Sequence, residues 1–176
     1  MLRLALAAAH LLALGIGLGS VWVRARALRG AAQDAGTRAA LGPSGPSPDS
    51  PSPDGLTPGS LRPAFVADNW WGVAAGLWLA TGLWRAIGGT EKTPSYYAQN
   101  VVFWAKMGLF ATLLLLEAWP MVTLIRWRIA VGRGVLPPGG PRTAARLARV
   151  SEVEVVLVVL IVLAAVAMAR GYGARG

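Results

Sequence analysis

The sequence predicts an all-α fold: a four-helix transmembrane bundle with both chain termini on the non-cytoplasmic side of the membrane. Three observations predict it: an apolar composition, four long apolar stretches, and arginine-rich loops that alternate with arginine-poor ones. The chain of 176 residues is 55% hydrophobic and only 14% charged, whereas soluble domains contain about 25% charged residues. A chain of this length and composition is expected to form a single integral membrane domain over residues 1–176.

Four apolar stretches approach or exceed the roughly 20 residues that an α-helix needs to cross ~30 Å of hydrocarbon. The expected spans are Leu4–Val23, Trp70–Ile87, Val101–Ile125 and Val153–Ala169. The first stretch has features of a secretory signal peptide. Its length and the arginines that follow it favour an uncleaved anchor instead.

Basic residues gather in the first and third of the loops that join these spans, and the second loop has few. The first loop contains Arg24, Arg26, Arg29, Arg38 and Arg62, and the third contains Arg126, Arg128, Arg133, Arg142, Arg146 and Arg149. The positive-inside rule places both of these loops in the cytoplasm. The net charge of +9 is therefore interpreted as a topology signal, and no nucleic-acid partner is expected.

The loops and span ends contain further local signals. Residues 30–60 are rich in Gly, Pro and Ser and predict a disordered cytoplasmic linker. Asp68 is expected to cap the second span, and Ser151 with Glu154 to form a capping box before the fourth. Arginines 142, 146 and 149 recur at helical spacing, which predicts a short amphipathic helix on the inner membrane surface.

Small residues recur four positions apart in two of the spans. The pairs are Gly15 with Gly19 and Gly72 with Gly76. Such pairs let two helix backbones approach closely. They predict tight packing either within the bundle or across a homo-oligomer, and the sequence does not choose between the two.

Three ionisable residues lie inside the predicted spans: His10, Lys106 and Glu117. Such residues are costly in a bilayer and are therefore the first candidates for function. At 1.5 Å per residue, His10 and Lys106 lie at matching depth in the outer half, about 9 Å and 7.5 Å from their span starts. They would face each other if the first and third spans were neighbours. Glu117 lies on the same helical face as Lys106, about 16 Å deeper.

Each of these residues has a functional and a structural interpretation. In the functional one, His10 is a neutral imidazole ligand of a haem or a metal, and Lys106 neutralises a propionate or another anion. In the structural one, His10 hydrogen-bonds a neighbouring helix, Lys106 snorkels outward, and Glu117 pairs with Arg126 or Arg24. The structural interpretation is preferred for Glu117, and both stay open for His10 and Lys106.

Several chemistries are excluded by residue counts. The chain has one histidine and no cysteine, so His-x-x-x-His metal sites, bis-histidine haem within one chain and cysteine nucleophiles are absent. No glycine fingerprint of a nucleotide-binding loop is present. No catalytic residue and no metal ligand is assigned, and whether the chain is an enzyme stays undecided.

Several motifs together resemble a family of predicted bacterial inner-membrane proteins with no assigned function. They are Asp68-Asn69-Trp70-Trp71-Gly72, Phe103-Trp104-Ala105-Lys106-Met107 and Glu117-Ala118-Trp119-Pro120-Met121. The chain is more distantly similar to the four-helix protoporphyrinogen IX oxidases and to copper-resistance membrane domains. That similarity implies His10 and Lys106 as cofactor-binding candidates, with haem b as the implied cofactor. The oxidase motif also has a histidine near the lysine, which is absent here.

Three function hypotheses follow. The first is a multi-pass protein of the bacterial inner (plasma) membrane with a structural or accessory role. The second is a haem-linked redox protein that resembles protoporphyrinogen IX oxidase. The third is a small-ligand or metal-ion permease that works as a dimer. The lipid bilayer and a second copy of the chain are the expected partners.

Overall fold

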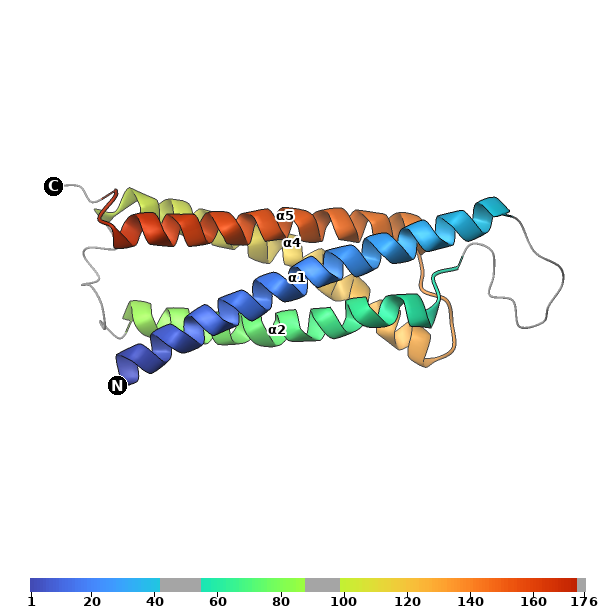
Figure 1. The fold of residues 1–176 in the computed structure, drawn as a ribbon, viewed down its shortest axis with the longest axis horizontal. Coiled ribbons are helices and arrows are strands. Elements are labelled where there is room, and N and C mark those ends of the chain that lie inside the picture. Colours follow the sequence, from blue (N-terminus) through green and yellow to red (C-terminus); the bar gives the residue numbers. More distant parts are fainter. Residues whose placement is uncertain (42–54, 88–98, 174–176) are drawn as a thin grey trace.

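The computed structural model describes residues 1–41, 55–87 and 99–173, and this part of the chain is built from long α-helices (Figure 1). They are α1 (Leu2–Leu41), α2 (Pro58–Ile87), α4 (Val101–Gly132) and α5 (Gly140–Ala169). No strand occurs in these ranges. The predicted all-α, four-helix fold is therefore confirmed.

The helices are longer than the predicted spans, with 40, 30, 32 and 30 residues. At 1.5 Å per residue they are about 45–60 Å long, well beyond the ~30 Å of a bilayer core. All four elements therefore extend beyond the hydrocarbon region if they cross it upright.

The predicted disordered linker over residues 30–60 is wrong at both ends. Residues 30–41 continue α1, and residues 58–60 already belong to α2. Gly30 and Gly36 each cost only about 1 kcal/mol of helix propensity. Buried Ala31 and Ala35 offset that cost by packing in the core. Residues 42–54 of the predicted linker lie outside the described residues.

Two predicted helix starts are also corrected. Helix α2 begins at Pro58, ten residues before Asp68. The Thr57 hydroxyl precedes this start and accepts a hydrogen bond from the Ser60 amide (3.2 Å). Helix α5 begins after Gly139, whose φ of 86° favours glycine. Ser151 and Glu154 are therefore interior residues of α5, and the predicted separate amphipathic helix forms the first turns of the same element.

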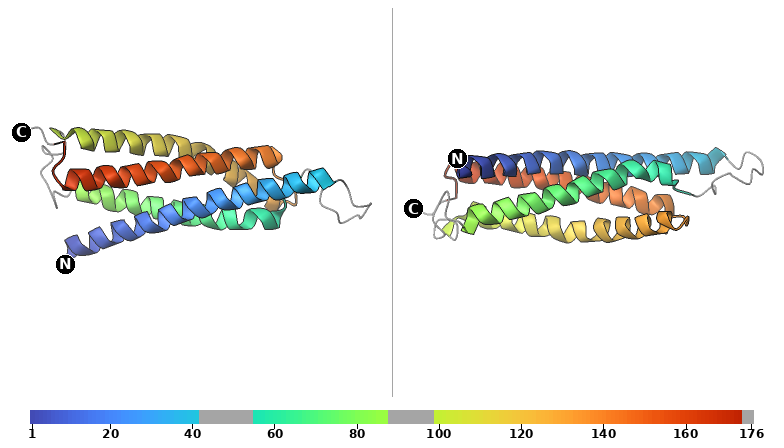
Figure 2. Two further views of the ribbon diagram at one scale, coloured as in Figure 1. Left: turned by 45° about the horizontal axis from the view of Figure 1, so that its top comes forward. Right: turned by 90° about the horizontal axis from the view of Figure 1, so that it is seen from below.

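Helix α1 packs mainly on α2 and α5, and α4 packs mainly on α5. In Figures 1 and 2 the four helices run side by side along one long axis. The first and third predicted spans are thus not the main neighbours of each other in the bundle.

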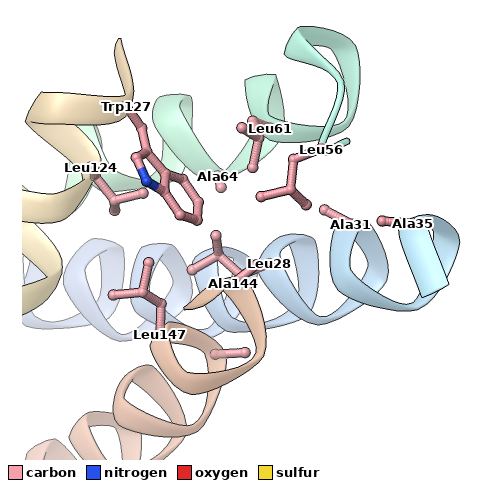
Figure 3. Close-up of a cluster of buried hydrophobic side chains, with 11 residues drawn as sticks. Leu28, Ala31, Ala35, Leu56, Leu61, Ala64, Leu124, Trp127, Ala144 and Leu147 are labelled. Atoms are coloured by element: carbon pink, nitrogen blue, oxygen red, sulfur yellow. The ribbon is translucent and has the colours of Figure 1, made fainter. Parts of the chain in front are cut away.

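Two buried apolar clusters lie at different levels along that axis. The polar-end core is centred on Trp127 (Figure 3), and it consists of Leu28, Ala31, Ala35, Leu56, Leu61, Ala64, Leu124, Trp127, Ala144, Leu147 and Ala148. The membrane-end core consists of Val21, Trp71, Leu113, Val158 and Ile161. The Trp127 indole N–H donates to the carbonyl of Pro138 (3.0 Å), which ties the loop between α4 and α5 to the polar-end core.

Within the described residues, α1, α4 and α5 are long and apolar enough to cross a membrane. Helix α2 does not reach that apolarity, since it contains Trp70, Trp71, Trp78 and Trp84. Tryptophan rings are amphipathic and favour the membrane interface over its centre. Length and composition therefore identify three candidate membrane spans in the described residues, and α2 lies against α1 as the fourth helix of the bundle.

Candidate functional site

The central polar feature of the bundle is Arg24 on α1, whose side chain is 0% exposed. Arginine is almost never fully buried unless its charge is paired. Arg24 shares the inward face of α1 with Val21 and Leu28, which are three positions before it and four after it and are also fully buried. Helical spacing alone therefore aims the guanidinium into the bundle.

The guanidinium of Arg24 bonds to all three other helices. Its Nη1 donates to Asp68 Oδ1 of α2 and to Glu117 Oε1 of α4, both at 2.8 Å. Its Nη2 donates to Glu117 Oε2 (2.7 Å) and to Glu154 Oε2 of α5 (2.5 Å), and Nε donates to Ser151 Oγ (3.0 Å). Arginine has five N–H donors, so these five bonds use the full capacity of the side chain.

A second arginine, Arg128 of α4, supports the same cluster. Its Nη2 donates to Asp68 Oδ2 (2.7 Å) and to the Phe65 carbonyl (2.8 Å), and Nη1 donates to Asn69 Oδ1 (2.5 Å). Asp68 therefore bridges two guanidinium groups. We refer to Arg24, Asp68, Glu117, Arg128, Ser151 and Glu154 as the Arg24 cluster.

Of the two partners predicted for Glu117, Arg126 or Arg24, the structure shows Arg24, and the geometry of the pair is bidentate. The capping roles predicted for Asp68, Ser151 and Glu154 are wrong, because all three side chains bond to Arg24. The sequence does contain one signal that Ser151 and Glu154 are buried in the bundle. Ser151 and Glu154 continue, at steps of three and four, the buried row of Leu147 and Val158 on one face of α5.

The other predicted candidate, His10, lies between α1 and α2. Its Nε2 accepts from the Trp78 indole N–H (2.9 Å), and its Nδ1 lies 2.9 Å from Thr81 Oγ1. Because Nε2 accepts, the proton of a neutral ring is on Nδ1 and is donated to Thr81. Gly82 makes room for the ring, since a Cβ there would lie 3.3 Å from His10 Cε1.

Lys106 lies on α4 with its side chain half-buried. Its Nζ lies 5.5 Å from the centroid of the Phe103 ring, one turn earlier in the same helix. A cation at this distance from an aromatic face is attracted by the ring quadrupole. The contacts described for His10 and Lys106 thus involve α2 and α4 respectively, and neither joins α1 to α4.

These residues do not fit a haem. Both ring nitrogens of His10 already have hydrogen-bond partners on α2, so an iron ligand would have to break the bond from Trp78. An apolar groove of about 530 Å³ opens between α1 and α2 near Gly19, Val66 and Trp70, but His10, Lys106 and Glu117 do not line it. Among the described residues, no group of three His, Cys, Asp or Glu side chains is arranged to hold a metal ion.

Comparison with known proteins finds a match to a protein family. The model of a family described as "Predicted membrane protein (DUF2214)" matches residues 53–173. The matched range contains α2, α4 and α5, and helix α1 with His10 and Arg24 lies outside it. No curated protein and no solved structure matches the chain.

Proposed function

The chain belongs to this family of predicted membrane proteins, and from that premise we propose that it is a multi-pass protein of the bacterial plasma membrane with a structural or accessory role. The observation that carries the proposal is that its buried polar groups bond to other helices of the bundle. All five N–H donors of Arg24 bond to side chains of other helices, and both ring nitrogens of His10 contact side chains of α2.

This use of polar groups distinguishes the proposal from the two alternatives. A haem-linked oxidase needs a ligand nitrogen turned toward the cofactor, and His10 turns both nitrogens toward protein. A permease needs a polar path, and the groove between α1 and α2 is lined mainly by apolar residues such as Ile16, Val23 and Val66. The geometry therefore supports a role in which the bundle itself is the functional unit.

The proposal includes a topology with four membrane crossings and both termini outside. The arginine-rich ends of the helices, which contain Arg29, Arg62, Arg133 and Arg142, would then face the cytoplasm. An even number of crossings requires that α2 also spans the membrane. Its 30 residues are long enough for that.

An absorption spectrum tests the role. The protein is purified in detergent from cells supplied with a haem precursor, beside a His10→Ala variant. We expect no Soret band in either sample. A stoichiometric band in the natural chain that disappears in His10→Ala would overturn the proposal in favour of the redox protein.

Thiol labelling tests the topology, and the chain suits it because it contains no cysteine. Single cysteines replace Leu136, which is 45% exposed between α4 and α5, and Tyr172, which is 66% exposed after α5. With a membrane-impermeant reagent on intact spheroplasts, Tyr172→Cys should react and Leu136→Cys should react only after permeabilisation. The reverse pattern would invert the proposed orientation, and equal labelling of both would contradict a crossing by α5.

We also propose that the chain forms a homo-oligomer. Gly15, Gly19, Gly72 and Gly76 have no atom within 4 Å of a Cβ built on them, apart from their own helix backbone and chain neighbours. These small residues therefore do not serve packing inside the described bundle, which supports the alternative of contact with a second copy. Disulfide cross-linking of a Gly76→Cys variant in membranes tests this: a dimer band supports the proposal, and monomer alone contradicts it.

A further inference from the structure

We propose that the Arg24 cluster is a binding site for one proton, which is shared between the carboxyl groups of Glu154 and Glu117. The proposal goes beyond the structural role argued above, because it gives the cluster a ligand that binds reversibly. Its basis is the charge balance of the cluster, one buried oxygen without a partner, and the crowding of two carboxylates on one nitrogen.

The charges of the cluster do not balance when every group is ionised. Asp68, Glu117 and Glu154 contribute three negative charges, and Arg24 and Arg128 contribute two positive ones. Arginine is always charged in proteins. A buried cluster with one excess negative charge is expensive in a medium of low dielectric constant, and one added proton makes the cluster neutral.

Glu154 is the carboxyl group that most needs this proton. Its side chain is 0% exposed, and Oε1 is a buried atom with no hydrogen-bond partner in the described part of the chain. An ionised carboxylate only accepts hydrogen bonds, whereas a protonated one also donates. A proton on Glu154 would remove the buried charge and create a donor for a neighbouring acceptor.

Glu117 provides that acceptor. Glu117 Oε2 and Glu154 Oε2 both accept from the same nitrogen, Arg24 Nη2, at 2.7 Å and 2.5 Å. Two carboxylates that share a site repel each other, and such pairs are stabilised when they hold one proton between them. The second oxygen of Glu117 is bonded to Nη1, so the guanidinium fixes one partner while the other takes the proton.

Each helix packed around Glu154 contributes a group that sets this equilibrium. Helix α1 brings the positive charge of Arg24, and α2 brings the negative charge of Asp68, which is also bonded to Arg128 of α4. Helix α4 brings Glu117, and α5 itself brings the neutral hydroxyl of Ser151. The charges of Arg24, Arg128, Asp68 and Glu117 sum to zero, so ionisation of Glu154 leaves the whole cluster with one net negative charge.

A proton is the ligand that this geometry accepts in preference to a metal cation. Arg24, Ser151 and Glu154 are all fully buried, so the centre of the cluster is packed. A proton needs no additional volume. A sodium or potassium ion would need several oxygen ligands, and the oxygens of Asp68 and Glu117 are already used by the two arginines.

Infrared difference spectroscopy of the purified natural chain in lipid nanodiscs tests the proposal, because a protonated carboxylic acid has a carbonyl band that a carboxylate lacks. We expect one such band near neutral pH that disappears on raising the pH. It should be absent from Glu154→Gln and present in Glu152→Gln. Glu152 is the matched control, since it lies on the same helix and pairs instead with Arg29 at the surface.

Unfolding measurements give an independent readout. If the folded chain holds a proton that the unfolded chain releases, the equilibrium constant for unfolding should rise by up to tenfold per pH unit above the ordinary carboxyl range, until the cluster ionises. Glu154→Gln should abolish that slope, and Glu152→Gln should keep it. No carbonyl band and no slope in the natural chain would overturn the proposal. An unfolding equilibrium constant that depends on the sodium or potassium concentration and not on pH would also overturn it.

Discussion

The two ends of the bundle are held together in different ways. In the polar-end core, Leu28, Leu61, Trp127 and Leu147 are each 0% exposed, and the surrounding surface contains many arginines. In the membrane-end core only five residues are buried, and large apolar side chains such as Leu115 face outward at 78% exposure. The polar end is built like a water-soluble protein, and the membrane end is not.

We expect the difference to follow from a difference in solvent, with lipid around the membrane-end core and water around the polar-end core. In water, burial of apolar surface drives packing, at about 25 cal/mol per Å². In lipid this driving force between helices is lost, and packing contacts and polar bonds hold the helices together instead. Arg24 lies between Val21 of the membrane-end core and Leu28 of the polar-end core. The Arg24 cluster thus marks the level at which one mode of stabilisation gives way to the other.

The largest effect is expected from Arg24→Ala. Removal of this cation leaves the carboxyl groups of Glu117 and Glu154 buried without their cationic partner, and Asp68 keeps only Arg128. Loss of one partner of a buried ion pair costs about 3–5 kcal/mol. The free energy of unfolding in mixed detergent measures it. Arg26→Ala, whose guanidinium lies 5.8 Å from the Trp22 ring on the same helix, is the control and should cost about 1 kcal/mol or less. Equal losses for the two variants would show that the cluster is not central.

A matched pair of leucines sharpens the comparison of the two cores. Leu28 and Leu113 are buried to nearly the same degree, at 0% and 2% exposure, one in each core. Leu28→Ala should cost roughly 2–5 kcal/mol, as in a water-soluble core. Leu113→Ala should cost clearly less, because lipid solvates the exposed apolar surface of the separated helices. Equal costs in the same unfolding assay would remove the proposed distinction between the two ends.

A smaller effect is expected at the membrane end from His10→Phe. The substitution keeps a ring but removes the bonds to Trp78 and Thr81. Hydrogen bonds between membrane helices contribute about 0.6 kcal/mol on average and about 1.7 at most. A double-mutant cycle with Trp78→Phe should give a coupling energy within that range. A coupling energy of zero would show that the bond from the Trp78 indole does not stabilise the bundle.

The smallest effect is expected from the surface pair of Arg29 and Glu152. Their side chains are 51% and 36% exposed, and exposed ion pairs contribute about 0–1 kcal/mol. Arg29→Ala should therefore change the free energy of unfolding by less than 1 kcal/mol, and added salt should remove the difference. A loss as large as that of Arg24→Ala would mean that the polar end depends on charges more than on its apolar core.

The sequence predicts the helical fold well, because hydrophobic runs of this length have few alternatives in a bilayer. It also predicts an ion pair of Glu117 with Arg126 or Arg24, since an acid inside a span needs a cation within reach, and the structure selects Arg24. Helix lengths are harder to predict. A hydropathy scan detects only the apolar part of a helix, but α1 and α5 continue beyond it with polar residues on one face. In those continuations the buried alanines and leucines, at residues 28–35 and 144–148, lie in a row on one face of each helix. Only that spacing indicates that the helix continues.

The composition of the Arg24 cluster could not be predicted from single helices. Asp68 and Ser151 each have the residue type of a helix cap, and local pattern alone does not distinguish a cap from a buried ligand. The distinction depends on Arg24, which is distant in sequence and which only the packing of α1 on α2 and α5 brings close. For His10 the sequence left two interpretations open, and the structure supplies its two partners on α2.

The central claim is that Arg24 joins the four helices through one network of buried charges. The most direct test compares Arg24→Met alone with Arg24→Met combined with Asp68→Asn, Glu117→Gln and Glu154→Gln, by their free energies of unfolding. Arg24→Met should lose about 3–5 kcal/mol. The combined variant should recover most of that loss, because the three acidic side chains that lost Arg24 are then neutral and the remaining charge, on Arg128, is 31% exposed. The account would be contradicted if the combined variant were less stable than Arg24→Met by the sum of the losses that the three other substitutions cause when each is made alone.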